Sequence, residues 1–134
     1  LLLQGKEAGM LDARELAMAV EESWRYLEKA GLRGSVGFDL KGNLPVQAAL
    51  TLYDIFEDVG EEVLARGEPF WLCRFKETEK DWIFSVVLED KEGETRPASW
   101  QALSEYDVSV QCDDTGYGTR LTVRLSREST DSFT

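Results

Sequence analysis

The sequence contains no histidine and only two cysteines among its 134 residues. The absence of histidine excludes Ser-His-Asp and Cys-His catalysis and the commonest zinc sites. Cys73 and Cys112 stand far apart without a Cys-x-x-Cys spacing, so they predict neither a disulfide framework nor a metal site. Each falls within a stretch of alternating apolar and polar residues, and we expect both to be buried thiols.

Positive charge is also scarce. Lysine and arginine together number 15 against 26 acidic residues, which gives a net charge of −11. A chain of this sign repels nucleic acid and anionic lipid, so neither is expected as a partner. No apolar run approaches the roughly 18 residues of a membrane span, and residues 1–3 are too short for a signal peptide. These features predict a cytoplasmic protein without membrane contact.

Length and composition favour one globular domain. Apolar residues make up 43% of the chain and charged residues 31%, which is enough apolar material for a sizeable core. We find no internal repeat, low-complexity tract or linker, so residues 1–134 are predicted to form a single domain. The chain does not begin with Met, and we expect it to be a piece of a longer protein.

Asp12 and Pro45 mark the beginnings of two predicted helices. Glu15 follows Asp12 at the capping-box spacing, and Gly31 is suited to end the first helix. The apolar stripe of this helix consists of Leu16, Val20, Trp24 and Leu27. The second helix is expected to end before Gly67 and Pro69 and to bury Ala48, Leu52, Ile55, Phe56, Val59 and Val63.

Alternating residues predict the strands. One covers residues 36–40, a hairpin joins 70–76 to 82–88, and a closing hairpin lies on both sides of the turn at 116–119. Residues 98–105 are predicted as a short helix and 127–134 as a frayed tail. The order of elements predicts an α+β two-layer sandwich, with one mixed, mostly antiparallel sheet and the helices on one face.

This order, the second helix and the Gly118-Thr119 step into the last strand resemble the ATP-binding domain of sensor histidine kinases, the GHKL or Bergerat ATPase fold. The resemblance covers nearly the whole chain. It implies a histidine-kinase-type ATPase fold near the C-terminus of a two-component signalling protein, with ATP and magnesium as cofactors. It also implies the other domains of that sensor and a response regulator as partners.

The resemblance assigns roles to particular positions. The second helix is similar to the family's N-box helix, with Asp58 at its acid and Glu62 at its magnesium-binding Asn. The strand at 82–88 is similar to the one that leads into the Asp-x-Gly-x-Gly box. Glu89 then falls at the adenine-reading Asp and Gly93 at the last Gly, while Thr119 supports the adenine contact. We predict no catalytic residue in this chain.

The sequence also departs from the family's pattern. Only residues 94–98 stand where the family has a lid and a second glycine-rich box, which would offer backbone N–H groups to phosphates. Glu62 replaces a neutral Asn by a second anion, and two such charges ~4 Å apart repel by ~4 kcal/mol at an effective dielectric of 20. We therefore expect degenerate nucleotide motifs, with ATP binding weak or absent.

Plainer interpretations stand beside these. The polar residues of the second helix also fit a solvated face or a partner contact, and Glu89 and Thr119 fit ordinary strand ends. Asp113 and Asp114 are expected in a simple turn, because the regular oxygen spacing of a calcium loop is missing. The alternative function is that of an α+β protein-interaction module unrelated to nucleotide binding.

Overall fold

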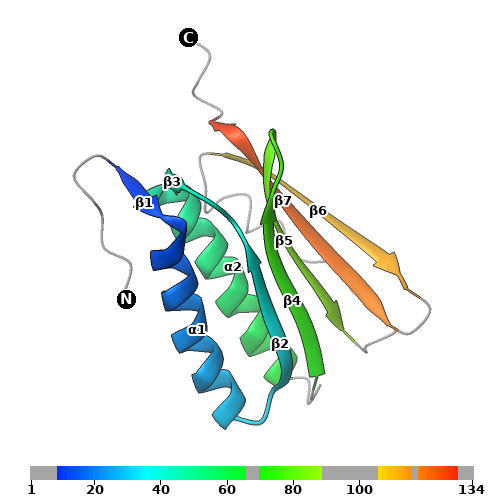
Figure 1. Cartoon of the computed structure of the whole chain (residues 1–134). Helices are drawn as coiled ribbons and strands as arrows, with labels where there is room; N and C mark the ends of the chain where they lie inside the picture. Colours follow the sequence, from blue (N-terminus) through cyan, green and yellow to red (C-terminus); the bar gives the residue numbers. More distant parts are fainter. Residues whose placement is uncertain (1–8, 66–69, 89–105, 116–117, 130–134) are drawn as a thin grey trace.

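Two helices lie on one face of a five-stranded sheet in the computed structural model of the chain (Figure 1). The structure describes residues 9–65, 70–88, 106–115 and 118–129. The elements are β1 (Met10–Asp12), α1 (Ala13–Lys29), β2 (Arg33–Asp39), β3 (Asn43–Pro45), α2 (Val46–Ala65), β4 (Phe70–Glu77), β5 (Asp81–Leu88), β6 (Tyr106–Asp114) and β7 (Thr119–Ser129).

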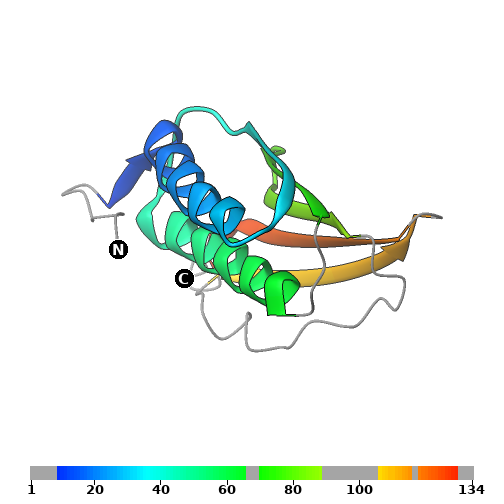
Figure 2. The same cartoon turned by 90° about the horizontal axis from the view of Figure 1, so that it is seen from below.

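The large sheet has the strand order β2-β4-β5-β7-β6. Strands β2 and β4 pair in parallel, and the other three neighbouring pairs are antiparallel. Seen from below, the helices form one layer and the sheet forms the other (Figure 2). The predicted α+β sandwich with a mixed, mostly antiparallel sheet and the helices on one face is confirmed.

The ends of α1 follow from their sequence. The Asp12 carboxylate accepts a 2.9 Å hydrogen bond from the backbone N–H of Arg14, which satisfies one of the free donors of the first turn. At the other end, Gly31 adopts φ +115°. Its N–H donates to the Glu28 carbonyl, and the N–H of Leu32 donates to the Leu27 carbonyl, both at 3.0 Å. This pair of bonds is a Schellman motif, which ends the helix as predicted.

A two-stranded sheet of β1 and β3 was not predicted. Leu11 lies opposite Leu44 in this antiparallel pair, and both side chains are buried. The N–H of Ala13 donates to the Gly42 carbonyl at 2.8 Å, and the N–H of Val46 donates to the Gly9 carbonyl at 2.9 Å. The small sheet therefore holds the first turns of α1 and α2 beside each other.

Aromatic side chains fill the core between α2 and the sheet. Phe56 of α2 is fully buried, and its ring centroid lies 5.4 Å from Trp71, 5.9 Å from Phe75 and 6.4 Å from Phe84. All six core positions predicted for the second helix are buried. Trp24 of α1 is only half-buried and stacks on Trp71 at 6.0 Å.

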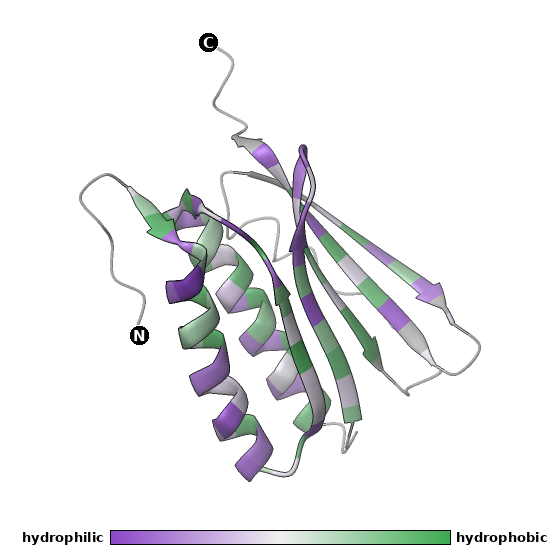
Figure 3. Cartoon of the chain, viewed as in Figure 1, coloured by the Kyte–Doolittle hydropathy of each residue, from purple (hydrophilic) through white to green (hydrophobic). Residues whose placement is uncertain are grey.

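Hydrophobic and hydrophilic residues alternate along the central strands (Figure 3). Successive side chains of a strand point to opposite faces of the sheet. The residues facing the helices are buried: Trp71, Cys73 and Phe75 in β4, Phe84 and Val86 in β5, and Leu121, Val123 and Leu125 in β7. We call the opposite side, turned away from the helices, the outer face.

Two predictions about the chain need correction, and two lie outside the described residues. The expected frayed tail is wrong for its first three residues, because β7 continues to Ser129. The Arg127 guanidinium donates to the Thr78 carbonyl at 2.8 Å and lies over the Trp82 ring. Cys73 is buried as expected, but Cys112 is only half-buried. The short helix at 98–105 and the stop at 67–69 fall on residues that the structure does not describe.

Candidate functional site

Asp58 and Glu62 lie one turn apart on α2. Side chains four residues apart share one side of a helix. Asp58 is exposed and Glu62 is half-buried. Because each residue advances about 100° around a helix with 3.6 residues per turn, this side is turned away from Glu57, which faces α1. The structure thus places the two predicted magnesium ligands next to each other.

The fit of this pair to magnesium depends on a phosphate. Among the described residues, no group of three or more histidine, cysteine, aspartate or glutamate side chains is arranged to hold a metal ion. Proteins usually bind Mg²⁺ through one or two carboxylates, with waters and substrate phosphates completing the octahedron. Asp58 and Glu62 therefore suit a metal that arrives with a nucleotide, rather than a site closed by protein ligands.

The surroundings of the pair are strongly acidic. Helix α2 carries five acidic residues and no basic one. Burial raises the pKa of the half-buried Asp54 carboxyl, and the negative charges of Asp58 and Glu57 raise this pKa further. A triphosphate that approaches α2 meets the same negative potential. The described residues of α2 include no cation that could take the place of those in an intact phosphate site.

Glu57 makes a second polar arrangement, which sequence reasoning missed. Its Oε2 accepts hydrogen bonds from the hydroxyls of Ser23 on α1 and Tyr53 on α2, each at 3.0 Å. Burial and the bond to Glu57 raise the pKa of Tyr53 to about 12. The Tyr53 hydroxyl therefore stays protonated well above neutral pH. The four-residue spacing of Tyr53 and Glu57 is visible in the sequence, whereas the partner on α1 is not.

Only one of the three predicted adenine-site residues can be placed. Thr119 begins β7, opposite Leu88 of β5 and Asp114 of β6. Its backbone therefore lies beside Leu88, the last residue of β5, and Leu88 immediately precedes Glu89 in the chain. Glu89 and Gly93 lie outside the described residues. Their roles in nucleotide binding stay predictions.

Hydrogen bonds join Thr115 to Gly118, just before β7. The N–H of Thr115 donates to the Gly118 carbonyl at 3.0 Å, and the N–H of Gly118 donates to the Thr115 hydroxyl at 3.2 Å. The Asp113 carboxylate accepts a 3.4 Å hydrogen bond from the amide of Gln111 on the same strand. Asp113 and Asp114 themselves lie at the end of β6, opposite Arg120 and Thr119 of β7, so the expectation that they form a turn is wrong.

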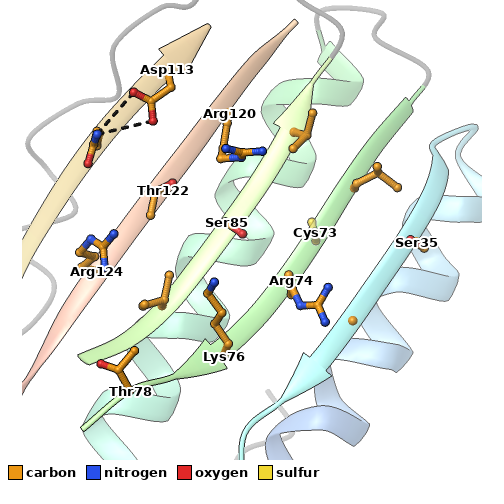
Figure 4. Close-up of a pocket in the computed structure, with 15 residues that line it drawn as sticks. Ser35, Cys73, Arg74, Lys76, Thr78, Ser85, Asp113, Arg120, Thr122 and Arg124 are labelled. Carbon is orange, nitrogen blue, oxygen red and sulfur yellow. Dashed lines mark hydrogen bonds between the residues drawn. The ribbon is translucent and has the colours of Figure 1, made fainter. Parts of the chain in front are cut away.

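A shallow hollow of about 700 Å³ lies on the outer face of the sheet (Figure 4). Arg74 and Lys76 of β4 lie on one side of it, and Arg120 and Arg124 of β7 lie on the other. Sequence reasoning treated these strands only as alternating segments. It missed the cluster, because the four cations meet only through the pairing of strands distant in the sequence.

Comparison with known proteins identifies the fold. No family profile matches the sequence, and no curated protein is recognisably similar to it in sequence. Solved structures of histidine kinases are similar in fold. The histidine kinase AdeS of Acinetobacter baumannii matches with a TM-score of 0.57 and 13% identity, over 95% of this chain and 70% of the solved AdeS chain.

Two isolated kinase domains match over nearly their whole length. The catalytic domain of the histidine kinase ThkA gives a TM-score of 0.60 at 6% identity, over 88% of this chain and 94% of that domain. The ATP-binding domain of PrrB from Mycobacterium tuberculosis gives 0.55 at 14% identity, over 90% of this chain and 97% of that domain. This chain spans only 41% of the ThkA chain solved in complex with the response regulator TrrA.

These likenesses show that the chain has the histidine-kinase-type ATPase fold. The mixed, mostly antiparallel sheet, the helices on one face and the closing hairpin are the features that were predicted for it. Within the described residues, no helix combines the length and the apolar character that a membrane crossing requires.

Proposed function

We propose that this chain is the histidine-kinase-like ATPase domain of a two-component sensor protein, with degenerate nucleotide motifs and weak or absent ATP binding. One observation carries the first part. The described fold matches the ATP-binding and catalytic domains of histidine kinases over 88% and 90% of this chain. The sequence departures and the charge of α2 support the second part.

In this proposal Glu89, Gly93 and Thr119 form what remains of the adenine site, and Asp58 and Glu62 form what remains of the magnesium site. A bound magnesium ion would neutralise part of the phosphate charge. The two carboxylates, one turn apart on α2, would hold it on the side of the helix turned away from α1. The other acids of α2 oppose the phosphates, because they add negative charge without contributing a described third metal ligand.

The partners that follow from the proposal are the other domains of the sensor and a response regulator, in the cytoplasm. Support comes from ThkA, whose structure in complex with the response regulator TrrA is similar to this chain with a TM-score of 0.54. A domain with the same fold can take part in such an assembly without hydrolysing ATP, because docking depends on its surface rather than on its nucleotide site.

Calorimetric titration at about 25 °C with ATP plus Mg²⁺, and separately with adenosine, tests the proposal. Each lost charge-assisted hydrogen bond removes roughly 1.5–3 kcal/mol, so losing two or three moves a micromolar site toward millimolar. We expect millimolar or undetectable ATP binding, and adenosine should bind about as well as ATP. Micromolar ATP binding that requires Mg²⁺, disappears in Glu62→Ala and persists in the neighbouring Glu61→Ala control would contradict the proposal.

The alternative is a protein-interaction module unrelated to nucleotide binding. The cationic outer face of the sheet favours this alternative, because none of the described residues predicted to bind nucleotide or magnesium lines it. A chain that binds neither ATP nor adenosine but retains a specific protein contact would fit this alternative.

A further inference from the structure

We propose that the outer face of the sheet docks an acidic amphipathic helix of a partner protein, which lies along the strands between β4 and β7. This inference goes beyond the proposed function, because it concerns the side of the sheet that is turned away from α1 and α2. It depends on neither ATP nor magnesium.

Four cations define the sides of the site (Figure 4). Arg74 and Lys76 form the β4 row, and Arg120 and Arg124 form the β7 row. All four side chains are exposed. Within the described part of the chain, none of them lies within ion-pair distance of a carboxylate. They are available for a negatively charged partner, although the chain as a whole carries a net charge of −11.

Strand β5 provides the floor between the two rows. Its outward residues after Asp81 are Ile83, Ser85 and Val87. The strand pairing places Ile83, which is only 3% exposed, between Lys76 and Arg124. Neighbouring strands lie about 4.8 Å apart, so β4 and β7 are separated by about 10 Å. That spacing is close to the diameter of an α-helix with its side chains, about 10–12 Å.

One end of the floor is apolar. Leu72 of β4 lies opposite Val87 of β5, and it is 43% exposed, one of the few large apolar side chains open to solvent in the described residues. Val87 is half-buried. An apolar stripe of a helix can cover these two residues, while acidic residues on both sides of the stripe reach the two cationic rows.

The acids on the outer face lie at its margins. By strand alternation Asp39 and Asp113 share this face and belong to the edge strands β2 and β6. Asp81 shares it too, as the first residue of the central strand β5. Asp113 already accepts a hydrogen bond from Gln111. The central part of the face is therefore positive, whereas all the charged residues of α2, on the other side of the sheet, are acidic.

The charge distribution favours a protein helix over nucleic acid or a membrane. We call the space between the two cationic rows the groove. Fields of exposed charges are screened beyond about 8 Å at physiological salt, so a short segment within the groove experiences mainly the four cations. A duplex or a lipid surface extends well beyond the groove and meets the negative remainder of the chain. A confined segment avoids that repulsion.

The test uses the full chain and a designed probe. The probe is a fluorescein-labelled, amidated helical peptide of about 20 residues, with leucine on one stripe and glutamate on both sides of it. Fluorescence anisotropy at about 50 mM salt should give micromolar binding that weakens as salt is added. The same peptide with lysine in place of glutamate should not bind.

Charge-reversal variants locate the site. We expect Arg74→Glu combined with Arg124→Glu to weaken binding at least about tenfold. The matched control, Arg25→Glu combined with Lys80→Glu, changes two exposed cations outside the groove by the same total charge and should stay within about twofold of the wild type. If the reversal variant does not fold, Arg74→Gln with Arg124→Gln provides the same comparison with a smaller electrostatic change.

Three results would overturn the inference. One is the absence of binding to the acidic peptide by the wild-type chain. Another is unchanged binding in the folded groove variant, or an equal loss in the control. The third is tighter binding to a DNA duplex of about 20 base pairs, or to phosphatidylserine vesicles, that the groove variant abolishes, since this would identify a general polyanion site.

Discussion

The hydroxyl of Ser23 on α1 donates a 3.0 Å hydrogen bond to Oε2 of Glu57 on α2, 34 residues further along the chain. The same oxygen accepts the Tyr53 hydroxyl. Nearby, the space above Gly60 is filled by the side chains of Leu27 and Trp71, so the remaining contact at this point is apolar. The Glu57 carboxylate is thus a polar link between α1 and α2, beside an apolar contact at Gly60.

Ser23→Ala and Tyr53→Phe should each destabilise the fold, because each removes a hydrogen bond to a charged acceptor worth roughly 1.5–3 kcal/mol. The half-exposed position of Glu57 places both effects at the lower end of this range. The double variant should lose more than the sum, since it leaves the carboxylate without either donor. Urea unfolding of the four proteins measures the coupling, with exposed Tyr26→Phe as a control. Additivity within about 0.5 kcal/mol would show that the two bonds act independently.

Asp54→Asn should stabilise the protein at neutral pH. Burial raises the pKa of Asp54, and the charges of Asp58 and Glu57 add to this shift. The folded state therefore holds the proton more tightly than the unfolded state. Protonated Asp54 therefore contributes to the stability of the fold. This contribution is complete below the usual pKa of 3.8 and is lost as pH rises through the raised pKa. The charged side chain consequently opposes folding at neutral pH.

Urea unfolding at neutral pH and in acid measures the effect of Asp54→Asn. The gain in stability at neutral pH should shrink as pH falls toward about 4. Exposed Glu61→Gln on the same helix is the control for a simple change of net charge. An Asp54→Asn protein that is no more stable than the wild type at neutral pH would contradict this interpretation of the site.

Phe56→Ala should destabilise the fold by about 3–5 kcal/mol, the usual cost of deleting a core aromatic side chain. Phe56 is completely buried, and its ring contacts three aromatic residues of β4 and β5. Chemical denaturation measures the loss, with Met18→Ala as the control, because Met18 is 68% exposed on α1. A loss below about 1 kcal/mol would mean that Phe56 does not hold the layers together.

Gly34→Ala should be among the most damaging substitutions in β2. Gly34 has φ +132°, and an added Cβ would lie only 1.7 Å from the carbonyl oxygen of Trp71 on β4. The parallel pairing of the two strands would have to open, with an expected loss above about 4 kcal/mol. Gly31→Ala is the control, because its added Cβ meets nothing within 4 Å and should cost only the backbone strain of about 1–3 kcal/mol. Equal losses in thermal or urea unfolding would exclude the steric explanation.

Much of the fold could be predicted, because the deciding signals are local. Asp12 and Gly31 bracket α1, Pro45 precedes α2, and alternation marks the strands of the large sheet. The small sheet was missed because strands of three residues, such as Met10–Asp12, are too short to show a period. Arg127 was assigned to a tail because its neighbours are polar. Its partners, Thr78 and Trp82, belong to the β4–β5 hairpin, and Thr78 precedes Arg127 by 49 residues in the chain.

The candidate site was less predictable, because its contacts join distant parts of the chain. Asp58 and Glu62 could be paired from their spacing along one helix. The hydrogen bond from Ser23 to Glu57 depends on how α1 packs on α2, which no local pattern reveals. The groove between Arg74 and Arg124 likewise depends on the register of three strands.

The alternation along β7 also constrains how this protein can evolve. Leu121 and Val123 belong to the core, and Arg120 and Arg124 belong to the outer face, on a single strand with a period of two. Inserting or deleting one residue within this strand would send the arginines into the core and the apolar residues into water. Substitutions can change either surface separately, whereas a length change of one residue in β7 alters both at once.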